Sequence, residues 1–169
     1  RLSALIDSFG GGVLVEDEQR RIVLVNREFC AMFAVPGPPE AMLGLDSLRA
    51  AEQSKALFKA PETFVAHLTE VLSRRRPTTG ELLEMADGRV LERDILPVRR
   101  SGQFAGNLWL YRDATARRKA QAAIEASEAR KRAILSAALD AVITTDQEGR
   151  ILEFNPAAER IFGHTARTV

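Results

Sequence analysis

One pattern occurs twice in this chain, and the spacing of its copies limits what the chain can fold into. Residues 13–34 align with residues 142–163 without a gap, at a constant offset of 129 residues. The matched pairs include Val13 with Val142, Asp17 with Asp146, Asn26 with Asn155 and Phe33 with Phe162. Solenoid repeats recur every 20 to 50 residues or so. We therefore expect one complete module, a connector and the opening of a second module.

Size and composition are those of an ordinary globular protein. The chain has 169 residues, of which 46% are hydrophobic and 28% charged, with a net charge of +1. One domain of roughly 110 residues fits this length. The near-neutral charge argues against a nucleic-acid-binding role. No run approaches the roughly 18 to 20 apolar residues of a membrane span.

The single cysteine, Cys30, excludes an internal disulfide and fits a reducing compartment, so a cytoplasmic location is expected. The chain starts without a methionine or a signal peptide. We expect a piece of a longer protein that makes no membrane contact within these residues.

Each copy of the repeat predicts two strands followed by a helix. Residues 13–16 and 21–25 are β-rich runs joined by a short turn, and Asn26 then stands where a helix N-cap is preferred. The second copy has Gly149 in its turn, where the first has Arg20, so the first turn is expected to be strained or differently shaped. Before the first copy, an amphipathic helix with Leu2, Leu5, Ile6 and Phe9 is expected to stop at residues 10–12, which are all glycine.

The middle of the chain predicts helices and then a three-stranded meander. A looser helical stretch with Met42, Leu45 and Leu48 precedes a helix over residues 61–75. Strands are expected at residues 79–85, 89–99 and 104–112. Asp87-Gly88 favours a type I′ hairpin, and Ser101-Gly102 joins the next pair. The order predicts an α+β fold with an antiparallel sheet.

The connector is predicted to be one long helix. Residues 114–139 are rich in alanine and charge and contain neither glycine nor proline. A heptad seam can be drawn through two isoleucines and four small or polar residues, Ala120, Ile124, Ser127, Lys131, Ile134 and Ala138. Such a seam buries little, so a coiled coil here would depend on the flanking domains.

Three segments together resemble a PAS domain, a sensory module of bacterial histidine kinases, diguanylate cyclases and related regulators. They are Asp17 with residues 21–29 (RIVLVNREF), residues 81–93 (ELLEMADGRVLER) and residues 106–113 (GNLWLYRD). The run DATARRK from Asp113 resembles the Asp-x-Thr-x-Arg junction that leads from such domains into a signalling helix. Residues 146–156 and 161–164 resemble the start of another PAS domain.

The resemblance implies a five-stranded antiparallel sheet with helices on one face, and boundaries at residues 1–113 for the first domain, 114–133 for the linker helix and 134–169 for the start of the second. It also implies a homodimer formed through the N-terminal and linker helices, and an output domain downstream. The parent protein would be a histidine kinase of a two-component system or a diguanylate cyclase or phosphodiesterase. Fold alone does not fix the ligand.

Two groups of residues are candidates for function. Phe29, Phe33, Phe64 and Leu68 are pocket candidates for an unknown small molecule. Asp113 and Thr115 can cap the long helix and couple the sheet to it. The plainer interpretation is a structural cap that carries no signal.

The sequence favours neither haem nor flavin. His67 lies on the helix where haem-binding PAS domains carry their ligand, but its neighbours do not resemble theirs. Cys30 is outside the Asn-Cys-Arg-Phe motif of flavin photoreceptors and is expected to behave as a small hydrophobe. No cysteine and histidine cluster has zinc spacing, and no catalytic set is evident.

The leading hypothesis is a non-enzymatic sensory and dimerisation module that relays a change in its core through the helix after Asp113. The alternative is a structural PAS domain that only dimerises and spaces its neighbours. Catalysis by these residues has the least support.

Overall fold

The computed structural model describes residue 6 and residues 8–166. The chain divides into two compact units, Arg1–Ala116 and Arg117–Val169. No helix in the described part of the chain is both long enough and apolar enough to cross a membrane.

The first unit is built on one five-stranded sheet. Its strands are β1 (Gly12–Glu16), β2 (Ile22–Val25), β3 (Thr78–Glu84), β4 (Val90–Arg100) and β5 (Gln103–Asp113). Their order across the sheet is β2-β1-β5-β4-β3, and all neighbours are antiparallel. The predicted α+β class and five-stranded antiparallel sheet are confirmed.

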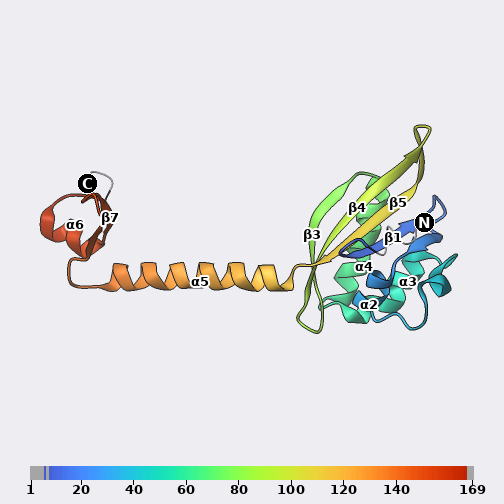
Figure 1. Ribbon diagram of the computed structural model, residues 1–169, viewed down its shortest axis with the longest axis horizontal. Coiled ribbons are helices and arrows are strands. Elements are labelled where there is room, and N and C mark those ends of the chain that lie inside the picture. Colours follow the sequence, from blue (N-terminus) through green and yellow to red (C-terminus); the bar gives the residue numbers. More distant parts are fainter. Residues whose placement is uncertain (1–5, 7, 167–169) are drawn as a thin grey trace. The chain divides into compact units, whose positions relative to one another are not determined.

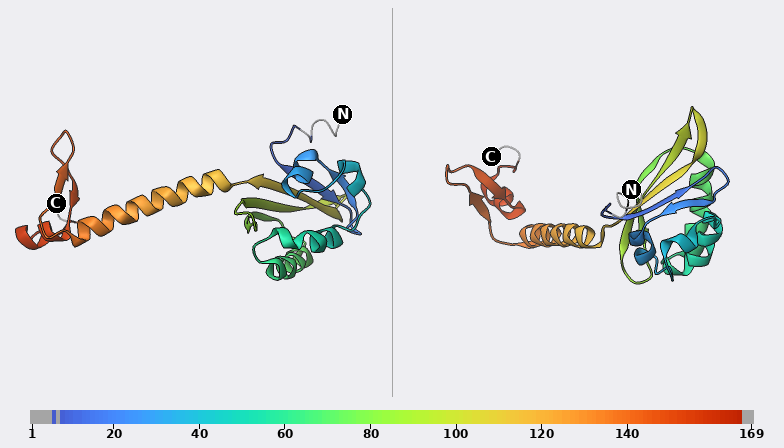
Figure 2. Two further views of the ribbon diagram at one scale, coloured as in Figure 1. Left: turned by 90° about the horizontal axis from the view of Figure 1, so that it is seen from below. Right: turned by 45° about the vertical axis from the view of Figure 1, so that its right-hand side comes forward.

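Helices cover one face of this sheet (Figures 1 and 2). They are α2 (Arg27–Met32), η1 (Pro39–Met42), α3 (Ser47–Ser54), η2 (Lys55–Leu57) and α4 (Pro61–Arg74). Helix α4 has Pro61 in its first turn and ends at Arg75, whose φ of 47° turns the chain out of the helix. The predicted helix over residues 61–75 is thus confirmed to within one residue.

The core lies between these helices and the sheet. The inward face of α2, which presents Phe29, Met32 and the adjoining Phe33, is buried. It meets core-facing side chains of three neighbouring strands, Leu14 on β1, Trp109 and Tyr111 on β5, and Leu91 and Ile95 on β4. Because α2 is only six residues long, its position depends on this packing rather than on helix propensity.

One of the two hairpin turns of the meander differs from expectation in its turn type. At Asp87-Gly88 only Gly88 has a positive φ, 87°, and its N–H donates to the carbonyl of Met85. The predicted type I′ turn is therefore wrong at this site, although the hairpin itself is present. The backbone needs only one left-handed residue here, because a type I turn followed by a glycine bulge also reverses the chain. Ser101 and Gly102, by contrast, both have positive φ.

The turn before β2 has the same hydrogen bond in both copies of the repeat. Arg20 has a φ of 63° and Gly149 one of 81°. The N–H of each donates to the carbonyl of the aspartate three residues before it, Asp17 or Asp146. Of the two outcomes expected for Arg20, strain is the one observed, because a residue with a side chain occupies the left-handed region.

The predicted N-terminal helix lies mostly outside the described residues, which include Ile6 and Phe9 of its apolar set. The glycines after it have a packing role as well. A Cβ on Gly11 would lie 2.3 Å from the carbonyl oxygen of Tyr111, and one on Gly12 would lie 3.1 Å from the Cα of Phe29. Glycine therefore lets the start of β1 pass close to β5 and α2.

The second unit begins within the long helix α5 (Thr115–Ala137). It continues with β6 (Ile143–Thr145), β7 (Ile151–Phe154) and α6 (Pro156–Phe162), the same order as β1, β2 and α2. Strands β6 and β7 pair antiparallel. None of the residues of α5 is buried in this single chain. The predicted continuous helix is confirmed, and it runs past residue 133, the expected end of the linker.

Candidate functional site

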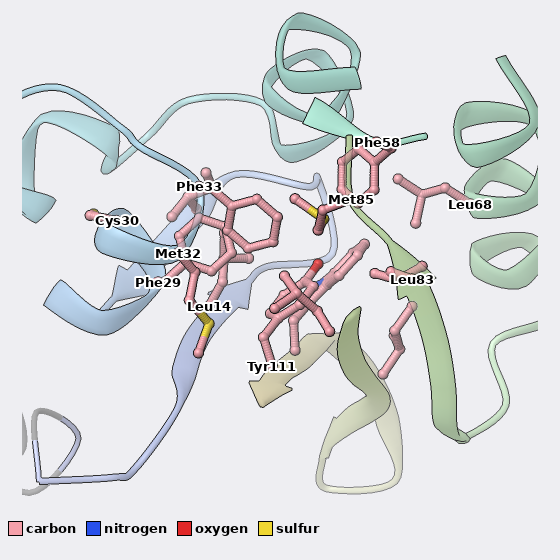
Figure 3. Close-up of a cluster of buried hydrophobic side chains, with 14 of the residues drawn as sticks. Leu14, Phe29, Cys30, Met32, Phe33, Phe58, Leu68, Leu83, Met85 and Tyr111 are labelled. Carbon is pink, nitrogen blue, oxygen red and sulfur yellow. The ribbon is translucent and has the colours of Figure 1, made fainter. Parts of the chain in front are cut away.

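A cavity of about 400 Å³ opens between the helices and the sheet of the first unit. Its wall is mostly aromatic and aliphatic. The side chains come from β1, α2, α3, η2, α4 and β5 and include Leu14, Phe29, Phe33, Ala51, Leu57, Phe58, Phe64, Leu68, Trp109 and Tyr111. Figure 3 shows several of them converging in the core. Concave, largely apolar cavities of this size are typical of small-molecule sites.

The four predicted pocket residues, Phe29, Phe33, Phe64 and Leu68, all line this one cavity. The spacing of α2 places Phe29 and Phe33 one turn apart on its inward face, and their ring centroids are 4.7 Å apart. Phe64 on α4 stacks on Phe58 with a centroid distance of 3.6 Å. The sequence thus identified side chains of one site on two separate helices, and ligand binding by them stays a prediction.

Aromatic contacts join the helices to the sheet. The ring of Tyr111 on β5 meets Phe33 edge to face at 5.0 Å and Phe29 at 5.5 Å. Tyr111 is buried, and burial raises the pKa of its phenol above the ordinary value. Its hydroxyl therefore stays protonated at the edge of the cavity.

A buried glutamate, Glu16, is joined to the cavity lining through Ser47. Glu16 is 1% exposed, and its Oε1 accepts a hydrogen bond from Asn107 Nδ2 at 2.6 Å. Its Oε2 accepts from the hydroxyl of Ser47, which lines the cavity. Sequence reasoning missed this group, although a glutamate that continues the apolar run Val13–Val15 at a core-facing position is a detectable signal.

Arg93 on β4 is a second buried polar residue, and it lies beside two rings of the cavity wall. Arg93 has no solvent exposure, and its Nε donates to Glu81 Oε2 at 2.8 Å. Its guanidinium carbon lies 5.5 Å from the ring centroid of Phe64 and 5.7 Å from that of Trp109. The arginine is thus paired and covered by aromatic faces, as a buried cation requires.

His67 faces this ion pair rather than the cavity. Its Nε2 lies 2.7 Å from Glu81 Oε1, and its side chain is 46% exposed. The residues that line the cavity do not include it. The structure therefore places the haem candidate of the sequence in a contact with Glu81 between α4 and β3.

Cys30 is buried, with its Sγ 4.0 Å from the sulfur of Met42. Burial raises the pKa of its thiol, so the unreactive protonated form is favoured. This placement agrees with the small-hydrophobe interpretation. Within the described residues no group of three or more histidine, cysteine and acidic side chains could hold a metal ion.

The junction between the sheet and α5 contains the two predicted coupling residues. The N–H of Thr115 donates to Asp113 Oδ1 at 2.8 Å, and the backbone N–H of Val90 on β4 donates to Thr115 Oγ1 at 3.0 Å. Hydrogen bonds from the Thr115 hydroxyl and N–H lower the pKa of Asp113. Asp113 therefore caps the start of α5 as expected, whereas the Thr115 hydroxyl also binds the first residue of β4.

Comparisons with known proteins agree with this architecture. A family model described as PAS fold matches residues 6–119, and another described as PAS domain matches residues 129–169. A curated relative, an uncharacterized protein of Azorhizobium caulinodans, is 58% identical over 43 residues, which are 25% of this chain and 6% of that protein. The match thus spans a small part of the relative's length.

Three solved structures are similar in fold. The PAS domain of Bordetella pertussis BvgS is 21% identical with a TM-score of 0.53, over 76% of this chain and 95% of that one. An RNA-binding Light-Oxygen-Voltage receptor is 17% identical with a TM-score of 0.55, over 76% and 36%. The sensor region of a sensor histidine kinase is 15% identical with a TM-score of 0.51, over 63% and 40%.

Proposed function

This chain belongs to the PAS fold family, and from that premise we propose that its first unit is a sensory and dimerisation module of a multidomain bacterial signalling protein. It binds a small molecule in the cavity and relays the resulting change through α5 to an output domain. The module itself is not catalytic. Its mechanism is a population shift, in which an occupied cavity favours one packing of the sheet and the outgoing helix.

The cavity is the observation that carries this proposal. Its volume of about 400 Å³ suits a small ligand, and its aromatic lining favours an apolar, ring-bearing molecule. Trp109 contributes to the wall, and its buried indole N–H has no acceptor among the described residues. A ligand that carries a hydrogen-bond acceptor would satisfy this donor.

The route out of the cavity is short. Trp109 and Tyr111 line the cavity from β5, and β5 ends at Asp113, which caps α5. Thr115 ties the same helix start to Val90 on β4. A change in the position of either strand therefore acts directly on the first turn of α5.

The exposure of α5 supports the dimer. No residue of this 23-residue helix is buried in the single chain, and Ile124 and Ile134 are 55% and 64% exposed. Isoleucines on one seam of a lone helix gain burial when a second copy packs against them. We expect the N-terminal helix to contribute to the same interface.

Native mass spectrometry of the purified chain tests ligand and dimer together. We expect a dimer that carries a bound small molecule. Ala51→Phe, which places a ring in the cavity, should lose the bound mass and keep the dimer. The matched control Ala66→Phe, at an exposed position of α4, should keep both.

Two other outcomes would count against the proposal. A dimer without any bound molecule would favour the structural alternative, in which the domain only dimerises and spaces its neighbours. A ligand-free monomer at all micromolar concentrations would contradict both interpretations.

A further inference from the structure

The side chain of Asn26 makes four hydrogen bonds to four different parts of the first unit. Its Oδ1 accepts from the N–H of Val13 at 2.8 Å and of Phe29 at 3.0 Å. Its Nδ2 donates to the carbonyls of Gly11 at 2.8 Å and Ile6 at 3.2 Å. The residue is 1% exposed, so these bonds do not compete with water.

Asn155 makes the same four bonds in the second unit. Its Oδ1 accepts from the N–H of Val142 and of Ala158, each at 2.9 Å. Its Nδ2 donates to the carbonyls of Asp140 at 3.0 Å and Leu135 at 3.2 Å. Two N–H groups require the amide oxygen and two carbonyls require the nitrogen, so only one orientation of each amide fits.

The backbone partners of the two asparagines also match at the repeat offset of 129 residues, although the residue types at most of the matched positions differ. Ile6 and Gly11 correspond to Leu135 and Asp140, and these positions lie before the repeated segments. Their contribution comes from the backbone carbonyl alone. These hydrogen bonds therefore depend on the path of the incoming backbone and not on its side chains.

In the second unit the incoming chain is α5 itself. Leu135 lies in the last turn of α5, where backbone carbonyls have no N–H donor within the helix. Asn155 binds one of these carbonyls with its nitrogen while its oxygen caps the N-terminus of α6. One side chain thus links the end of α5 to Val142, directly before β6, and to the first turn of α6.

We propose that Asn155 is the positioning residue through which the second module responds to α5, and that Asn26 has the same role for the segment that enters the first module. Helix α5 is then an output element at Thr115 and an input element at Leu135. In the first module the linked helix residue, Phe29, is also part of the cavity wall. The signalling meaning of the link rests on the proposed function, whereas the link itself requires no ligand.

An N-cap without this role is available for contrast. Asp46 caps α3 by accepting from the N–H of Arg49 at 2.9 Å. An ionised aspartate has no donor, so it can cap a helix but cannot bind an incoming carbonyl. Replacing asparagine by aspartate therefore separates the two roles, because it keeps the cap and places a charge against two carbonyl oxygens.

The test is hydrogen exchange, measured by mass spectrometry on the full chain. In Asn155→Asp we expect exchange in residues 131–139 to rise about tenfold, the effect of losing a buried hydrogen bond, while α6 keeps its protection. The control Asp46→Ala, which removes a cap from α3 only, should leave residues 131–139 unchanged. Unchanged exchange there in Asn155→Asp would overturn the proposal.

A second variant decides the question if Asn155→Asp unfolds β6 and β7 as well. Ala133→Gly weakens the end of α5 at an exposed position and leaves the asparagine in place. We expect exchange in α6 to rise about threefold to fivefold, because glycine destabilises a helix interior by about 1 kcal/mol relative to alanine. The control Ala122→Gly, farther from the link, should leave α6 unchanged.

If α6 does not respond to Ala133→Gly, the link does not transmit and the proposal is wrong. Neither readout requires a bound ligand, and each compares a variant with the unchanged chain at one protein concentration. A negative result in native mass spectrometry therefore leaves this inference standing, and a negative result here leaves the cavity proposal standing.

Discussion

At the scale of single residues, the first unit contains two local departures from an ideal sequence for its fold. Arg20 occupies a left-handed turn position that the second copy gives to Gly149. Arg93 is a fully buried cation on the core side of β4, between Leu91 and Ile95. Each affects the free energy of unfolding of this unit. Trp109, the single tryptophan, reports that unfolding by fluorescence.

Arg20→Gly should raise the free energy of unfolding by about 0.5 kcal/mol. It removes a left-handed strain of about 1 kcal/mol and gives back part of that through the greater freedom of glycine in the unfolded chain. Glu18→Gly, in the same turn at ordinary φ, should lower it. Urea unfolding followed by Trp109 fluorescence measures both, and equal signs for the two variants would contradict the strain.

Glu81→Ala should lower the free energy of unfolding by about 3 to 5 kcal/mol, because it leaves Arg93 buried without its partner. The matched control is Glu84→Ala on the same strand. Glu84 pairs with Lys59 at the surface, where an ion pair contributes little, so its loss should change stability only slightly. Replacing both partners, Glu81→Leu with Arg93→Met, should recover most of the loss. Similar effects of the two single variants would refute the role of the buried pair.

At the scale of elements, the stability of the junction with α5 depends on pH. Hydrogen bonds from Thr115 hold the pKa of Asp113 below its ordinary value in the folded state. The stabilising effect of Asp113 is therefore complete above the unfolded pKa, about 3.9, and is lost as pH falls through the lower folded pKa.

The melting temperature of Asp113→Ala should accordingly differ from that of the unchanged chain more at pH 7 than at pH 3. Thr115→Val, which removes a hydroxyl that does not titrate, should retain part of its effect at pH 3, since the bond from Val90 is lost at either pH. A melting-temperature difference for Asp113→Ala that is the same at both pH values would show that the carboxylate does not hold the helix start.

The elements were largely predictable because their signals are local. Hydrophobic periodicity, N-cap residues and turn residues predicted the strands, the helix of residues 61–75 and the asparagine caps. The turn type at Asp87-Gly88 was not predictable, since two geometries share that dipeptide. The donor half of Asn26 was also hidden, because its partners are backbone carbonyls whose residue identity is irrelevant.

The candidate site was predictable in part for the same reason. Phe29, Phe33, Phe64 and Leu68 follow from helical periodicity and converge on one cavity. The polar groups beside the wall were missed. Glu16 acquires its partners Asn107 and Ser47 from elements far away in sequence, and Arg93 meets Glu81 only through the register of β4 against β3. Two signals could have indicated them: alternation along β4 gives Arg93 a core-facing position, and Glu16 continues the apolar run Val13–Val15 at such a position.

At the scale of the whole molecule, the chain is a series of modules in which one helix has two roles. Helix α5 starts at the Asp113 and Thr115 junction of the first unit and ends at the Asn155 link of the second. The repeat therefore includes more than a duplicated strand pair, because in both modules the asparagine also binds carbonyls of the chain that enters the module. The proposed relay requires that the state of the cavity reaches this helix.

Hydrogen exchange of α5 in a variant with a filled cavity measures whether the cavity and α5 are coupled. In Ala51→Phe, exchange over residues 115–126 should change by at least about fivefold, the lower end of typical coupling between sites. Ala66→Phe should leave the same residues unchanged. If Ala51→Phe alters exchange around the cavity while residues 115–126 keep theirs, the cavity does not communicate with α5 and the relay is refuted.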